Sequence, residues 1–90
     1  MKLQNSLTNE QRAEIMRLTA EMKGERTFDQ VGRFLGIHGS TLQPTVAYGR
    51  PPVLRHLLQW RLHSTDEGVR AWAQAILEVL GLLDEKDRRD

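Results

Sequence analysis

Apolar residues recur along this chain with the period of a helix rather than that of a strand. After Thr8 they include Ile15, Leu18 and Met22, whose i, i+3, i+7 spacing places them on one helix face. Alternation with a period of two is not sustained in any segment, and β-branched residues are scattered. The pattern therefore predicts an all-α fold of about five helices.

Residues that start and stop helices divide this pattern into segments. A Ser or Thr followed three residues later by Glu or Gln, the spacing of a capping box, occurs at Thr8, Thr27 and Ser64. We expect three of the helices to start there. Glycines expected to end helices are Gly24, Gly36, Gly49 and Gly81. Gly32 falls inside a predicted helix, where we expect another helix to approach closely.

Prolines restrict the middle of the chain. Proline lacks an N–H group and its ring clashes with the preceding turn, so Pro44 is expected within the first turn of a helix. The stretch from Thr41 to Gln43 would then supply the cap. Pro52 is expected at the first position of the next helix, which is the most apolar part of the chain.

The last predicted helix is amphipathic, with a continuous apolar stripe. Its members are Val69, Trp72, Ala73, Ile76, Leu77 and Leu80. The stripe is wider than a five-helix core of 90 residues strictly requires, so it predicts either a dimer interface or the fifth helix of a monomer. We favour a homodimer that forms through the last two predicted helices, with Val69, Trp72, Ile76 and Leu80 as the candidate interface residues. Trp60 and Trp72 are otherwise expected in the core.

Length and composition set limits on the class of protein. Ninety residues suffice for one domain with a modest core, expected over residues 1–83, followed by a charged tail over residues 84–90. The chain has no cysteine, which suits the reducing cytoplasm of a cell. No apolar run approaches the roughly 18 residues that span a membrane, and the N-terminus lacks the apolar segment of a signal peptide. We expect a cytoplasmic protein with no membrane partner.

The net charge of +1 conceals an uneven distribution. Residues 26–61 contain five arginines and a single acid, whereas residues 64–90 contain four basic residues and seven acids. A basic middle and an acidic end suit a chain whose middle meets phosphates. Ordinary solvation of surface charges would account for the same distribution.

A short motif lies between Val31 and Leu42. Its members are Val31, the small residue Gly32, the run Leu35-Gly36-Ile37, and Leu42 six residues after the turn glycine. This pattern resembles the helix-turn-helix of phage repressors, the Cro/C1 or Xre-like group, which includes small regulators encoded beside anti-CRISPR genes. The sequence Gly49-Arg50-Pro51-Pro52-Val53-Leu54 is similar to the continuation found in many of them.

The resemblance implies a helix-turn-helix at about residues 27–48 in a small, non-enzymatic transcriptional regulator of phage or mobile-element origin. Its partner would be double-stranded operator DNA. The family reads bases three, four and eight positions after the turn glycine, which here are Gly39, Ser40 and Pro44. Two of these cannot offer a side-chain hydrogen bond, so the chain departs from the family at the reading positions. A shifted register would use Ser40, Thr41, Gln43 and Thr45.

The departure leaves two functions open. For DNA binding, the candidate phosphate contacts are Arg33, Arg50 and Arg55. Alternatively, the same scaffold would be a phage-encoded module that docks on a host protein. The three histidines lack metal-ligand spacing, and no catalytic arrangement is visible, so we expect no metal, no cofactor and no enzymatic activity.

Overall fold

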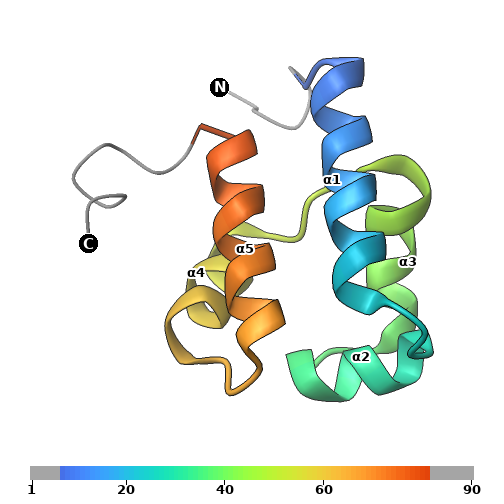
Figure 1. The fold of residues 1–90 in the computed structure, drawn as a ribbon, viewed down its shortest axis with the longest axis vertical. Helices are drawn as coiled ribbons and strands as arrows, with labels where there is room; N and C mark the ends of the chain where they lie inside the picture. The colour runs from blue at the N-terminus through green and yellow to red at the C-terminus, as the bar shows by residue number, and fades with distance from the viewer. Residues whose placement is uncertain (1–6, 82–90) are drawn as a thin grey trace.

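The computed structural model describes residues 7–81, which form five α-helices and no strand (Figure 1). The helices are α1 (Asn9–Lys23), α2 (Phe28–Leu35), α3 (Gly39–Tyr48), α4 (Leu54–His63) and α5 (Glu67–Val79). The predicted all-α fold of about five helices is therefore confirmed. The expected tail, residues 84–90, lies outside the described residues.

The helices associate as two pairs joined by α1. Helix α2 packs on α3, and α4 packs on α5, while α1 contacts both α3 and α5 (Figure 1). We call α2 and α3 the helix-turn-helix pair, and α4 and α5 the C-terminal hairpin. None of the five described helices combines the length and apolar character needed to cross a bilayer.

Two tryptophans occupy the centre of the core, as expected. The rings of Trp60 and Trp72 stack with their centroids 5.5 Å apart. Trp60 Nε1 donates a hydrogen bond of 2.9 Å to the carbonyl of Leu35, and Trp72 Nε1 donates one of 2.9 Å to Thr19 Oγ1. These bonds tie the C-terminal hairpin to α2 and to α1. The buried apolar residues are Ile15, Val31, Leu35, Leu42, Leu57, Trp60, Val69, Trp72, Ala73, Ile76 and Leu77.

The apolar stripe of α5 is part of this core, so Val69, Trp72 and Ile76 are not the interface residues that the sequence predicts. Val69 and Ile76 are fully buried and Trp72 is nearly so, while Leu80 is half-buried and packs against the same cluster. The physical reason is that α1 and α4 of the same chain already cover the stripe. Val69, Trp72 and Ile76 are therefore covered within one chain and cannot form the surface of an interface.

Helix starts agree with the sequence at two of the three expected positions. Both threonines form complete capping boxes, with Thr8 Oγ1 accepting from Gln11 N at 3.0 Å and Thr27 Oγ1 accepting from Gln30 N at 3.1 Å. Ser64 does not start a helix. Asp66 caps α5 instead, because its carboxylate accepts from the N–H of the third helical residue at 2.9 Å.

Proline positions were also predicted incorrectly. Helix α4 begins at Leu54, two residues after Pro52. Helix α3 begins at Gly39 and contains Pro44 well beyond its first turn. The missing N–H of Pro44 would have donated to the carbonyl of Ser40. Because the Ser40 side of the helix is exposed, water can hydrate that carbonyl, and the helix continues past the proline.

Candidate nucleic-acid interface

A glycine corner sets the direction of α3. Gly36 ends α2 in the left-handed conformation, with φ 71° and ψ 27°, which glycine adopts without a steric penalty. The turn after α2 packs closely against Gly32 of that helix, because a Cβ there would lie 2.6 Å from the Ile37 carbonyl oxygen. The predicted close approach at Gly32 is thereby confirmed. At Gly39 a Cβ would lie 2.8 Å from the Phe28 carbonyl oxygen, so the start of α3 lies directly on α2.

One side of α3 is largely open to solvent, with Pro44 half-buried at its middle. Ser40, Pro44 and Tyr48 follow one another at four-residue intervals and therefore form a row on the helix surface. Thr41 lies on one flank of this row and Ala47 on the other, and both are exposed. Gln43 is also exposed and lies on the same flank as Ala47, four residues before it. These six residues are called the α3 outer face below.

Three of the four predicted base-contacting residues belong to the α3 outer face, and the fourth does not. Ser40, Thr41 and Gln43 are exposed, whereas Thr45 is only 3% exposed. The reason is helical spacing, because Thr45 lies three residues after the buried Leu42 and shares its inward direction. Thr45 is therefore a core residue and cannot contact a base.

His38 lies at the start of the α3 outer face, a position that the sequence did not indicate as part of the candidate site. It is the N-cap of α3, and its Nδ1 atom accepts a hydrogen bond from Ser40 N at 3.2 Å and lies 2.8 Å from Ser40 Oγ. An accepting Nδ1 requires the neutral tautomer with its proton on Nε2. The exposed ring therefore presents an N–H donor at the start of the α3 outer face.

Tyr48 is a second residue that sequence reasoning missed. Its side chain is 67% exposed, although it is a large aromatic group near the end of α3. An exposed phenol offers both a hydrogen-bonding hydroxyl and a flat apolar surface. Its four-residue spacing from Pro44 could have identified it, because residues at that interval share one helix face.

The three candidate arginines do not converge on one surface. Arg50 follows α3 directly, after Gly49 ends the helix, and is exposed. Arg33 lines a hollow on α2 with Phe34, whereas Arg55 lines a separate hollow on α4. Arg50 is thus the candidate that continues the α3 outer face.

Helix α3 contains no charged residue. Within residues 7–81 the ion pairs are confined to α1, where Arg17 contacts both Glu14 and Glu21. The carboxylate nearest the start of α3 is that of Asp29, since a Cβ at Gly39 would lie 2.8 Å from its Oδ1 atom. This negative charge favours the helix N-terminus but would repel a phosphate at that end.

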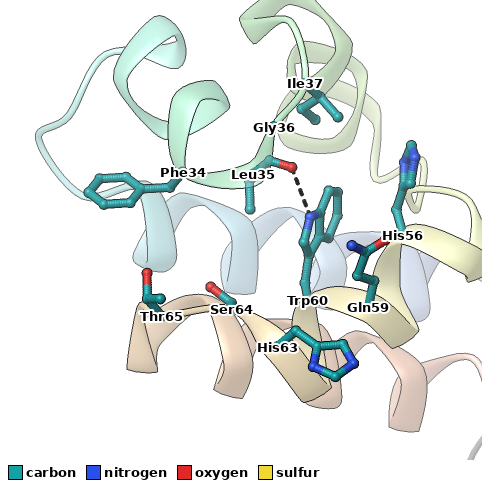
Figure 2. A pocket seen from close by; sticks show the side chains of 10 residues that line it. All are labelled: Phe34, Leu35, Gly36, Ile37, His56, Gln59, Trp60, His63, Ser64 and Thr65. Atoms are coloured by element: carbon teal, nitrogen blue, oxygen red, sulfur yellow. Dashed lines mark hydrogen bonds between the residues drawn. The ribbon is translucent and has the colours of Figure 1, made fainter.

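A cleft of about 370 Å³ separates the glycine corner from α4 (Figure 2). Trp60 lines this cleft, and the dashed line in Figure 2 marks the hydrogen bond that it donates to the Leu35 carbonyl. In Figure 2 the rings of His56 and His63 point away from one another, so these imidazoles do not converge on a common point. The two histidines therefore do not supply the convergent polar groups of a small-molecule site.

Metal ligation finds no support within residues 7–81, where no group of three His, Cys, Asp or Glu side chains is placed to hold an ion. A scan against protein-family models gave no match for the chain, and comparisons with curated proteins and with solved structures gave none either. The function is therefore inferred from the α3 outer face and its surroundings.

Proposed function

We propose that this protein is a small, non-enzymatic DNA-binding transcriptional regulator that inserts the α3 outer face into the major groove. The observation that supports it best is the row Ser40–Pro44–Tyr48, exposed at both ends and half-buried at Pro44, on a helix whose opposite side is fixed to α1 and α2. A B-DNA major groove about 12 Å wide admits one α-helix. The resemblance to Cro/C1-type regulators, a phage or mobile-element origin and a cytoplasmic location belong to this proposal.

Base reading on this surface combines one amide with apolar contacts. Gln43 is exposed and can form two hydrogen bonds to adenine through its N6 and N7 atoms. Pro44 and Ala47 offer apolar surface of the kind that contacts a thymine methyl group. Ser40 and Thr41 supply hydroxyls near the helix start, where they suit a base edge. The target is therefore expected to be rich in A·T pairs.

Phosphate binding is assigned first to Arg50, because it directly follows α3. Each phosphate neutralised by an arginine releases counterions, so its loss lowers the salt dependence of binding by about one unit. Arg33 and Arg55 face other surfaces and would contact phosphates only outside the central groove.

Pairing of two copies remains a prediction from the sequence, but the buried residues of the α5 stripe cannot form the interface between them. Each domain would occupy one half-site, and two half-sites about one helical turn apart would bring two copies together on the duplex. Because the α5 stripe is buried, we expect the free protein to be a monomer of 10.4 kDa.

The decisive experiment selects sequences from a pool of randomised duplexes at low salt and then measures affinity for the selected sequence by fluorescence anisotropy. The Gln43→Ala change should weaken binding by about 1–3 kcal/mol and relax the preference for adenine at one position. The Arg50→Ala change should weaken binding to all sequences and reduce the salt slope.

Matched controls exist on helices away from the α3 outer face. Gln74→Ala on α5 removes the same amide from an exposed site, and Arg17→Ala on α1 removes the same charge. Both should bind as the parent protein does. If no selected duplex binds more tightly than random duplex, or if the controls lose as much affinity as the test variants, the proposal is wrong.

A further inference from the structure

Helix α4 exposes a row of leucines to solvent. Leu54, Leu58 and Leu62 are 45%, 37% and 61% exposed and follow one another at four-residue intervals, so they share one face. Within residues 7–81, four of the six large exposed apolar side chains belong to α4 or to Val53, its N-cap. An apolar row of this kind on a small domain marks an interaction surface.

Basic side chains border the leucine row. Arg55 lies three residues before Leu58 and Arg61 three residues after it, so helical geometry places them on opposite flanks of the row. Arg55 also lines a shallow hollow of about 610 Å³ formed with the three leucines. Helix α4 contains no acidic residue at all. Its outer face is therefore apolar along the middle and positive along both edges.

We propose that the leucine row of α4 is a docking surface for an acidic amphipathic helix of a partner protein. Such a helix would place apolar residues at i, i+4 and i+8 against Leu54, Leu58 and Leu62, as helices do in apolar grooves. Its flanking carboxylates would then meet Arg55 and Arg61, which have no carboxylate within ion-pair distance among the described residues. This inference does not depend on DNA binding.

Charge argues for this occupant over a second copy of the chain. Two α4 helices packed face to face would bring four arginines together without a single carboxylate from either helix. A contact between α4 and some other surface would find little apolar area, because the remaining large exposed apolar residues among the described ones are Phe34 and Tyr48, on separate helices.

The test uses the full chain and a fluorescent synthetic peptide of about 15 residues, with leucines at i, i+4 and i+8 and glutamates on both flanks. A second peptide keeps the leucines and replaces every glutamate with lysine. Anisotropy titrations should show binding of the acidic peptide and at least about tenfold weaker binding of the basic one. Leu62→Glu should reduce binding of the acidic peptide by about tenfold or more.

Leu62 is chosen because its high exposure leaves little packing to lose, and a thermal melt by circular dichroism checks that the variant folds. Gln74→Glu on α5 is the matched control, since it adds the same charge elsewhere and should bind normally. Equal binding of both peptides, or no binding of the acidic one, would overturn the proposal. A parent protein of twice 10.4 kDa that Leu62→Glu converts to a monomer would instead identify a second copy as the occupant.

Discussion

The helix-turn-helix pair and the C-terminal hairpin are held together in opposite ways. In the first, Gly32 and Gly39 remove side chains so that two backbones meet. In the second, Trp60 and Trp72 fill the space between helices with stacked rings. A close contact between two backbones fixes the relative direction of the two helices but buries little side-chain volume, whereas the packed rings bury a large apolar area. The helix-turn-helix pair therefore sets the orientation of α3, and the C-terminal hairpin contributes more of the stability.

Removing buried volume from the hairpin should have the largest effect. Leu57 is fully buried on α4, whereas Leu62 on the same helix is 61% exposed. Leu57→Ala is expected to lower the free energy of unfolding by about 2–5 kcal/mol through lost burial and a residual cavity. Leu62→Ala, the same chemical change on the same helix, should alter it by less than about 0.5 kcal/mol. Urea denaturation measures both.

Similar losses of stability for Leu57→Ala and Leu62→Ala would contradict the placement of Leu57 in the core and of Leu62 on the surface. A large loss for Leu62→Ala that grows on dilution would mean that Leu62 is buried between copies. The predicted ratio thus tests both the core and the monomeric state.

Adding volume to the glycine corner should have the next largest effect. Gly32→Ala improves helix propensity by about 1 kcal/mol, but its methyl group would approach a backbone oxygen at 2.6 Å, which cannot move aside cheaply. We expect a net destabilisation of about 1–3 kcal/mol, typical of overpacking. Gly36→Ala meets nothing within 4 Å and instead strains a positive φ, at a cost of about 1–2 kcal/mol.

These two variants should also differ in DNA binding, measured on the selected duplex. Gly32→Ala displaces the start of α3 relative to α2, so it should weaken binding beyond its effect on folding. A Gly32→Ala protein of unchanged stability and affinity would show that the close approach does not set the direction of α3.

Much of the fold followed from the sequence because its signals are local. Capping at Thr8 and Thr27 and the left-handed turn at Gly36 depend on neighbours in the chain, and all three were predicted correctly. The predicted N-cap of α5 was wrong because Ser64 and Asp66 are both good capping residues. The sequence alone does not show that Ser64 is already used to end α4.

The site was predicted less completely, because exposure is a tertiary property. Thr45 is a polar residue within the predicted helix, but it lies three residues after the buried Leu42 and therefore faces inward. The α5 stripe was compatible with a core or with the dimer interface that we favoured, and only the positions of α1 and α4 show that most of it is core. The leucine row of α4 lies in the helix that the sequence identifies as the most apolar, and only the structure shows that this row is exposed.

The smallest effect is expected on α1, the helix that joins the two pairs. There Arg17 donates to Glu14 at 3.1 Å and to Glu21 at 2.7 Å, and its hydrogen bond lowers the pKa of the Glu14 carboxyl below the usual value. A depressed folded pKa means that the contribution to stability is present above the unfolded pKa and is lost as the pH falls through the folded one. Glu14→Gln should therefore be slightly less stable than the parent at about pH 7 and equal to it at about pH 3. Urea midpoints at the two pH values measure this difference, and a gap that widens in acid would show that Arg17 does not stabilise the ionised carboxyl.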